Sequence, residues 1–227
     1  MDLAQYKTWV FDCDGVILDS NLLKTQAYYD TAIAFGATHD QAQAIMDYHV
    51  KLGGVSRYPK YQYFLEEILG RPATQEDMDF LLARFASEIH QGLLHCKIAD
   101  GLFELRQKYP DAKWMVLSGG DQEELRALFH ERQLAGLFDA GIFGSPDNKD
   151  QVLEREAANG NVTHPALFLG DSKYDHEAAA AAGLDFIFIR GWTEFDEWER
   201  YCNANGIVTT LQLADLLNEN PQFASHA

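Results

Sequence analysis

Five short runs of apolar residues punctuate the chain, at residues 8–11, 114–117, 140–143, 166–169 and 186–189. Each run is continuous and rich in aliphatic or aromatic side chains, a pattern typical of strands buried on both faces of a parallel sheet. Segments with helical spacing separate the last four runs, at residues 122–133, 151–159 and 177–182. This alternation predicts βαβ units, and therefore an α/β fold with a Rossmann-like parallel sheet and helices on both faces.

The stretch between the first run and about residue 97 has a different pattern, with no comparable buried strand. Helices are expected there at residues 21–35, 38–52, 61–69 and 74–95. Thr38 followed by Gln41 matches a capping box, and Thr74 is a good cap for the last helix. We therefore expect a helical cap domain, residues 18–96, inserted into an α/β core made of residues 1–17 and 97–227. The tail after Asn218 is expected to be frayed.

Composition narrows the classes of function. At 227 residues with 47% hydrophobic residues, the chain can bury one or two cores. Its net charge of −17 argues against nucleic acid or an anionic membrane surface as a partner. The three cysteines, Cys13, Cys96 and Cys202, are far apart, which makes a disulfide framework or a zinc site improbable and fits a reducing cytosol.

The beginning of the chain shows no basic region followed by an apolar run, so we expect no signal peptide. No apolar run is long enough to span a membrane. These features predict a cytoplasmic protein, and the sequence leaves open whether it is a monomer or a homodimer.

Two carboxylates, Asp12 and Asp14, lie two residues apart where the first apolar run ends. Ligands of open α/β folds bind at the carboxyl ends of strands, and the alternation of a strand would aim both side chains at the same side. Two adjacent carboxylates repel each other unless a cation or a proton compensates. A hard divalent cation, Mg²⁺, explains the pair. A solvated Asp-x-Asp-Gly turn is the alternative.

Polar residues also follow the next two core runs. Ser118 and Gly119 offer a hydroxyl and backbone N–H groups that can bind phosphate oxygens, although this is also ordinary turn chemistry. Lys149 follows the third run and could neutralise a phosphate or an aspartate nucleophile. Taken alone, a solvated surface lysine is the commoner interpretation.

Asp171 and Asp175 follow the fourth run. Asp171 could complete a metal site that Asp175 orders from behind, or Asp175 could simply cap an alanine-rich helix. The strength of the pattern is its order, because independent surface residues would rarely line up on the ends of successive strands in this way.

This ordered set resembles the haloacid dehalogenase-like superfamily of phosphotransferases over the whole chain, including a helical insertion after the first strand. The motifs that carry the resemblance are residues 12–20, Ser118, Lys149 and residues 170–175. The resemblance implies that Asp12 is a nucleophile that forms an aspartyl-phosphate. It also implies that Asp14 protonates the leaving alcohol and then activates water.

The same resemblance implies a Mg²⁺ site. Asp12 and Asp171 would bind the ion through their carboxylates, Asp14 through its backbone carbonyl, and Asp175 would support the site. Ser118 would hold the transferred phosphoryl group, and Lys149 would balance its charge.

Further residues bear on the branch of the family. Dehalogenase and phosphonatase members lack an aspartate at the position of Asp14, so its presence favours phosphate esters. Residues 53–60 resemble the cap loop of β-phosphoglucomutase-like members, in which Arg57 would grip a second phosphate or a carboxylate with Lys60 nearby. The alternative for Arg57 is a surface arginine in a helix-breaking turn.

Lys24 stands where mutase-like members often have a histidine. Its side chain would face the substrate or merely solvent, and its presence weakens a mutase interpretation.

We therefore predict a Mg²⁺-dependent phosphatase acting on a small phosphorylated metabolite, such as a sugar phosphate, a sugar-acid phosphate or a phosphoglycolate-like compound. Arg57, Lys60, Lys24 and Gly119 are the expected substrate ligands. Closure of the cap would exclude water from the site. Two alternatives stay open, a phosphomutase of the β-phosphoglucomutase type and a phospho-accepting receiver that signals without turnover.

Overall fold

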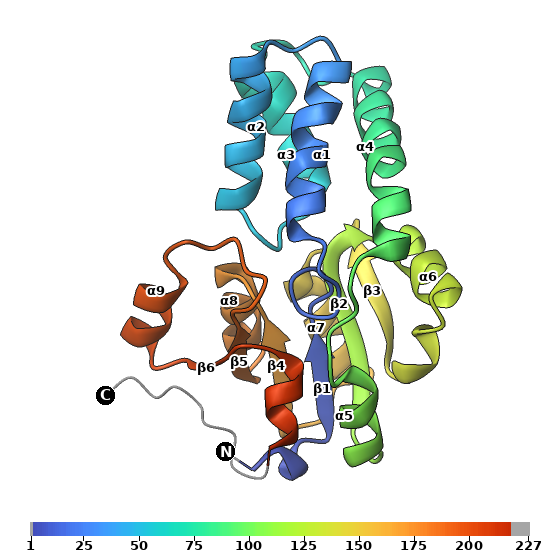
Figure 1. Cartoon of the computed structure of the whole chain (residues 1–227), viewed down its shortest axis with the longest axis vertical. Coiled ribbons are helices and arrows are strands. Elements are labelled where there is room, and N and C mark those ends of the chain that lie inside the picture. Colours follow the sequence, from blue (N-terminus) through green and yellow to red (C-terminus); the bar gives the residue numbers. More distant parts are fainter. Residues whose placement is uncertain (1, 219–227) are drawn as a thin grey trace.

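A computed structural model describes residues 2–218 and has an α/β architecture built on one six-stranded parallel sheet (Figure 1). The strands lie in the order β3-β2-β1-β4-β5-β6. Their bounds are β1 Thr8–Phe11, β2 Lys113–Asp121, β3 Gly141–Ser145, β4 Ala166–Gly170, β5 Asp185–Ile189 and β6 Val208–Thr210. The predicted fold class is confirmed, and each predicted apolar run overlaps one of β1–β5. The sixth strand was not predicted.

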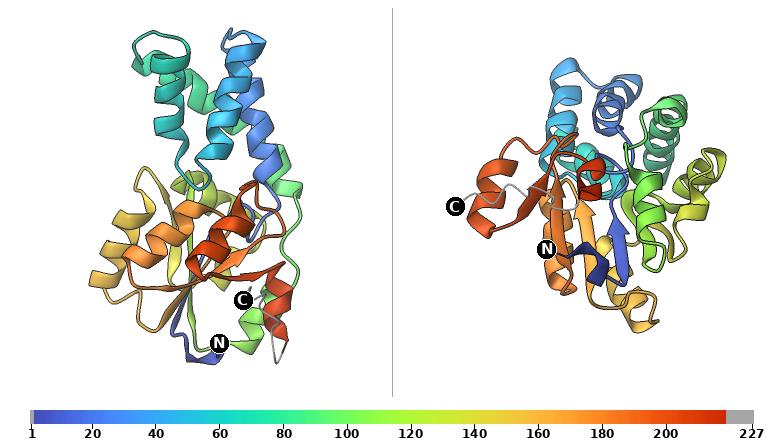
Figure 2. Two further views of the ribbon diagram at one scale, coloured as in Figure 1. Left: turned by 90° about the vertical axis from the view of Figure 1, so that its left-hand side faces the viewer. Right: turned by 60° about the horizontal axis from the view of Figure 1, so that its bottom comes forward.

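Side chains of the sheet alternate between two cores. In β1, Trp9 and Phe11 belong to one core and Val10 to the other, as the two-residue period of a strand requires. The first core is covered by α5 (Leu102–Lys108), α6 (Gln122–Glu131) and the 3₁₀ turn η4 (Leu213–Leu217). The second is covered by α7 (Lys149–Ala158), α8 (Lys173–Ala181) and α9 (Trp198–Asn205). Helices therefore pack on both faces of the sheet (Figure 2).

A group of helices follows β1 and stands over the carboxyl ends of the strands (Figure 1). It consists of α1 (Asn21–Ala34), α2 (His39–Lys51), α3 (Arg57–Tyr63), the π-helical turn η2 (Phe64–Ile68) and α4 (Gln75–His95). These helices bury a core of their own, with Tyr28, Tyr61 and Phe85 at its centre. We refer to them together as the cap.

Local signals explain where the cap helices begin. Thr38 and Gln41 make both bonds of a capping box at the start of α2. The helix expected from residue 61 begins earlier, at Arg57, because the Ser56 hydroxyl caps it by accepting a bond from the Tyr58 N–H.

The chain enters and leaves the cap at one place. The N–H of Ala99 donates to the carbonyl of Ile17 at 2.8 Å, and the N–H of Asp19 donates to the carbonyl of Lys97 at 3.0 Å. The two connections thus run antiparallel, side by side, and form a short two-stranded crossing between core and cap.

Among the described residues, no helix has both the length and the apolar character needed to cross a bilayer. Cys13, Cys96 and Cys202 are free thiols. The expectation of a frayed tail beyond Asn218 concerns residues outside those that the structure describes.

Candidate active site

The connectivity of the sheet brings two aspartates together. Strand β1 lies between β2 and β4, so the chain switches from one side of β1 to the other between β3 and β4. Asp12 directly follows β1, and its N–H donates to the carbonyl of Leu169 in β4 at 2.9 Å. Asp171 directly follows β4. The site therefore forms at the topological switch point, where open α/β sheets bind their ligands.

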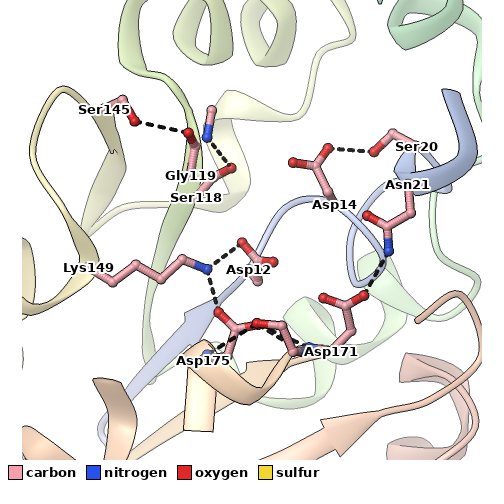
Figure 3. A network of polar contacts seen from close by, with 12 residues as sticks. Asp12, Asp14, Ser20, Asn21, Ser118, Gly119, Ser145, Lys149, Asp171 and Asp175 are labelled. Carbon is pink, nitrogen blue, oxygen red and sulfur yellow. Dashed lines mark hydrogen bonds and ion pairs between the residues drawn. The ribbon is translucent and has the colours of Figure 1, made fainter. Parts of the chain in front are cut away.

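Three buried carboxylates gather at this point. Oxygens of Asp12, Asp171 and Asp175 lie within 4.8 Å of one another. Lys149, at the start of α7, donates to Asp12 Oδ1 at 2.9 Å and also to Asp175 Oδ1 (Figure 3). One ammonium group faces three carboxylates, which leaves an excess of two negative charges. A divalent cation with a preference for oxygen ligands fits this arrangement.

Asp175 is engaged on both of its oxygens. Its Oδ2 accepts bonds from the Asp171 N–H at 3.2 Å, the Ser172 N–H at 3.0 Å and the Ser172 hydroxyl at 2.6 Å, while Lys149 bonds Oδ1. Ser172 and Asp175 also form the capping box of α8. Asp175 therefore takes part in the helix cap and at the same time holds Asp171 and Lys149 in place, while the role of Asp171 in a metal site stays a prediction.

Burial, and after it the neighbouring carboxylates, shift the pKa values of the cluster. Burial raises the pKa of Asp12 to about 7; Lys149 opposes this shift, and Asp175 and Asp14 add to it. Burial, together with Asp12 and Asp175, also raises the pKa of Asp171 well above its ordinary value. A bound cation would favour the ionised form of both carboxyl groups.

Asp14 has a different environment from Asp12. Its Oδ1 accepts from the Ser20 hydroxyl and its Oδ2 from the Lys24 ammonium, each at 2.6 Å. Burial would raise the pKa of Asp14, but Lys24 and Ser20 outweigh it and hold the pKa below its ordinary value. Two aspartates two residues apart thus differ in their readiness to ionise.

Gly15 lets the chain turn tightly past the cluster. Its φ is +78°, and a Cβ built at this position would lie 2.1 Å from Asp171 Oδ2. Both the left-handed backbone and the close approach require glycine. Steric constraints therefore explain directly why the first motif has a glycine at position 15.

The end of β2 supplies Ser118 and Gly119. The Ser118 hydroxyl is buried and accepts a bond from the Gly120 N–H at 3.0 Å (Figure 3). A Cβ at Gly119 would lie 2.5 Å from the carbonyl oxygen of Gly54, so the cap loop passes directly over this strand end.

A pocket of about 380 Å³ lies between the cap and the core. Among the charged residues that line it are Asp12, Asp14 and Asp171 from the core and Lys24, Arg57 and Lys60 from the cap. Sequence positions far apart in the chain therefore share one cavity, and the predicted cap residues face the predicted nucleophile.

Two of the three cap cations predicted as substrate ligands, Arg57 and Lys60, are buried. Arg57 is 6% exposed and forms an ion pair with Glu124 of α6, so the alternative of a surface arginine is wrong. Lys60 is 1% exposed, and its Nζ lies 2.9 Å from His49 Nδ1.

Some neighbours of the site were not predicted. Asn21 donates to Asp171 Oδ2 and to the Trp192 carbonyl, each at 2.8 Å, and Thr25 donates to Glu194 at 2.7 Å. Asn21 directly follows the first motif and opens α1, a position that could have drawn attention to it. Glu194 lies in an irregular segment after β5, where no pattern in the sequence marks it.

A model of the haloacid dehalogenase-like hydrolase family matches residues 6–183. This chain belongs to the haloacid dehalogenase-like hydrolases. The predicted membership and the prediction of a hydrolase are therefore confirmed. A search of curated proteins found no match.

Solved structures share the fold of this haloacid dehalogenase-like hydrolase over nearly all of its length. A predicted phosphoglycolate phosphatase of Haemophilus somnus is 15% identical with a TM-score of 0.70, covering 95% of this chain and 98% of its own. A phosphonoacetaldehyde hydrolase like protein of Oleispira antarctica is 15% identical with a TM-score of 0.69, covering 94% and 90%. A candidate β-phosphoglucomutase of Thermotoga maritima is 21% identical with a TM-score of 0.62, covering 93% and 97%. At these identities the likeness concerns the fold.

Proposed function

We propose that this haloacid dehalogenase-like hydrolase is a Mg²⁺-dependent phosphatase that removes the phosphoryl group from a small phosphorylated metabolite. One observation carries the proposal: Asp12 lines the pocket while sharing a buried cluster with Asp171 and Lys149. This places a potential nucleophile, an oxygen-only cation site and a fixed positive charge around one point. The excess negative charge of the cluster matches the charge of the ion.

In the proposed reaction, a carboxylate oxygen of Asp12 attacks phosphorus as the bond to the leaving alcohol oxygen breaks. A water molecule then attacks the phosphorus of the aspartyl-phosphate, which releases inorganic phosphate and restores Asp12. Lys149 neutralises charge on Asp12, and Ser118 donates its hydroxyl to a phosphoryl oxygen. Asp12 and Asp171, with the backbone carbonyl of Asp14, would hold Mg²⁺, which would supply positive charge to stabilise the phosphoryl oxygens.

Asp14 moves the protons of both steps. Lys24 holds it as a carboxylate, which is the form that accepts a proton from water in the second step. In the first step Asp14 must carry a proton to give to the leaving alcohol. The proposal therefore requires that a bound substrate draws Lys24 away from Asp14.

The test is phosphate release from a panel of phosphate monoesters and p-nitrophenyl phosphate, with Mg²⁺ and with a chelator. We expect Mg²⁺-dependent release that Asp12→Asn abolishes, and a phosphorylated protein in acid-quenched wild-type samples but not in the variant. Release that survives Asp12→Asn, or no release from any ester, would refute the proposal.

The same samples separate the alternatives. A phosphomutase would return an isomerised sugar phosphate, which chromatography of the products detects, and a receiver would accumulate a long-lived aspartyl-phosphate without releasing phosphate. The replacement of the mutase histidine by Lys24, which is already paired with Asp14, supports hydrolysis.

A further inference from the structure

Three of the cap cations that line the pocket, Lys24, Arg57 and Lys60, differ in how their charge is balanced. Lys24 pairs with Asp14 at 2.6 Å, and Arg57 pairs with Glu124. Within residues 2–218, no carboxylate lies at ion-pair distance from the ammonium group of Lys60. Lys60 is nevertheless among the most buried side chains, at 1% exposure.

The groups that contact the Lys60 ammonium are neutral, and Asp14 and Glu194 act on it only from beyond ion-pair distance. Its Nζ lies 2.9 Å from His49 Nδ1 and 5.6 Å from the centre of the Tyr28 ring, on which His49 stacks. Burial lowers the pKa of Lys60 to about 7, and nearby Lys24 adds to this shift. Burial and Lys60 lower the pKa of His49 well below its ordinary value, so the imidazole is neutral.

A buried amine without a negative partner is costly unless a ligand supplies one. Lys60 lines the same pocket as Asp12, so a single ligand in the pocket can meet both residues. The volume of about 380 Å³ lies in the range of small-molecule sites. A negatively charged group on the substrate would therefore supply the counter-charge that the Lys60 ammonium lacks.

Resting on the phosphatase function proposed above, we propose that Lys60, supported by His49, binds a carboxylate of the substrate, so that the enzyme acts on the phosphate monoester of a hydroxy acid. The charge of the site favours a carboxylate over a second phosphate. One unneutralised ammonium matches one negative charge, whereas a phosphate dianion would bring a second negative charge into a site where Glu194 already acts on Lys60 from beyond ion-pair distance. Arg57 then connects the cap to the core through its ion pair with Glu124 and does not bind the substrate carboxylate.

Two pairs of esters test this assignment, since the members of each pair differ only by a carboxylate in place of a hydroxymethyl group. One pair is 2-phosphoglycolate and 2-hydroxyethyl phosphate, and the other is 6-phosphogluconate and glucitol 6-phosphate. We expect wild-type enzyme to favour the acid in at least one pair by about 10- to 100-fold in kcat/KM, the range of a hydrogen bond to a charged group. Fructose 1,6-bisphosphate, which carries a second phosphate and no carboxylate, tests whether Lys60 binds a phosphate instead.

The decisive variant is Lys60→Met, which keeps the length of the side chain and removes its charge. We expect the acid-to-alcohol ratio of kcat/KM to fall to near one, mainly through a higher KM for the acid. Lys60→Gln is the second variant, and circular dichroism checks the folding of both. Lys51→Met is the matched control, because Lys51 is at the rim of the same pocket but is exposed; its ratio should stay as in wild type.

Each outcome has a distinct meaning. If wild-type enzyme shows no preference for an acid in either pair, or if Lys60→Met retains the preference, the inference is wrong while the phosphatase function stands. A preference for the bisphosphate that Lys60→Met removes would overturn the choice of a carboxylate. Absence of turnover on every ester, including p-nitrophenyl phosphate, would refute the phosphatase function itself.

Discussion

At the scale of single residues, Gly15 couples the first motif to the carboxylate cluster through the space that it leaves for Asp171. Gly15→Ala places a methyl group 2.1 Å from Asp171 Oδ2 and also strains a φ of +78°. We expect a loss of more than about 2 kcal/mol in the free energy of unfolding and a weaker affinity for Mg²⁺, because left-handed backbone alone costs about 1–2 kcal/mol for a residue with a Cβ. Urea denaturation and calorimetric titration with Mg²⁺ measure the two effects.

Gly36→Ala is the matched control for that substitution. Gly36 also has a positive φ, of +98°, but a Cβ there would meet no atom within 4 Å. We expect Gly36→Ala to lower the free energy of unfolding through the strained backbone alone and to leave the affinity for Mg²⁺ unchanged. An equal loss of affinity in both variants would contradict the steric explanation.

Lys60 should leave a signature in the dependence of stability on pH. Its pKa is lowered from 10.5 to about 7 in the folded protein by burial. Between these two values the unfolded chain binds more protons than the folded one, so the contribution of Lys60 to stability rises with pH. Below the folded pKa the full cost of the buried charge is present.

We therefore expect the stability of wild type relative to Lys60→Met to increase from about pH 7 to about pH 10, by on the order of 3 kcal/mol. Urea denaturation of the two proteins at several pH values measures this difference, in which the titration of all shared groups cancels. A difference that does not change with pH would show that the amine of Lys60 is not perturbed.

The chemistry at the ends of the strands was predictable residue by residue, but its partners were not. Asp12 and Asp171 each follow a continuous apolar run, and strand ends meet at one edge of a parallel sheet. The ion pair of Arg57 with Glu124 joins segments that are distant in the chain, and the sequence has no local pattern that records it. The burial of Lys60 was also unpredictable, because lysine is ordinarily exposed.

At the scale of elements, the contact between α3 and α6 is one of the ties that hold the cap over the core. Arg57 at the start of α3 pairs with Glu124 in the first turn of α6, and Tyr58 OH donates to Asp121 Oδ2 at 3.2 Å. The Ser145 hydroxyl adds a bond of 2.7 Å to the Ser56 hydroxyl. These bonds stabilise the arrangement of the cap over the core in this structure.

Glu124→Ala should therefore weaken closure for every substrate alike. We expect KM to rise by about three- to tenfold for both the acid and the alcohol of a matched pair, with little change in their ratio, because a partly exposed ion pair contributes about 1 kcal/mol. Steady-state kinetics with both members of the pair measure the two KM values and their ratio. Glu123→Ala is the control, since Glu123 is 80% exposed and pairs only within α6, with Arg126. A selective loss for the acid in Glu124→Ala would instead place the carboxylate at Arg57.

Elements with strong periodicity were predicted well, and short ones were missed. Strand β6 has only three residues, Val208–Thr210, and the segment α5 has only seven, so neither gives a pattern long enough to stand out. Strand β2 runs to Asp121, past the apolar run, because it stays paired with β3 through an irregular stretch that contains Ser118 and the two glycines. Polar site residues can thus belong to a strand that its hydrophobic pattern underestimates.

At the scale of the whole molecule, we expect the stability of the protein to depend on a cation at the clustered carboxylates. We expect Mg²⁺ to raise the melting temperature, since ligand at about 100 times its Kd adds about 2.7 kcal/mol, and each kcal/mol shifts a chain of this size by about 2–4 °C. At a pH at which Asp171 is ionised, Asp171→Asn should raise the melting temperature without Mg²⁺, because it removes a buried charge, and it should reduce the response to Mg²⁺. Differential scanning calorimetry measures both.

The strongly acidic surface calls for a control in the same experiment. With a net charge of −17, the protein can gain stability from Mg²⁺ through general screening. Asp79→Asn removes an exposed carboxylate from α4 and should keep the wild-type response. An unaltered response in Asp171→Asn would mean that the ion acts elsewhere on the surface.

The paired crossing at Ile17–Ala99 and Asp19–Lys97 bears on how such a protein can diversify. The chain leaves and re-enters the core at one point, so the cap is a single insertion. Its two connections to the core are hydrogen-bonded to each other. Replacing the residues between the two connections leaves Ser118 on β2, Asp12 and Asp171 directly after β1 and β4, and Lys149 at the start of α7. We therefore expect recombination within one stretch of the gene to change the leaving group, while the proposed catalytic residues keep their places.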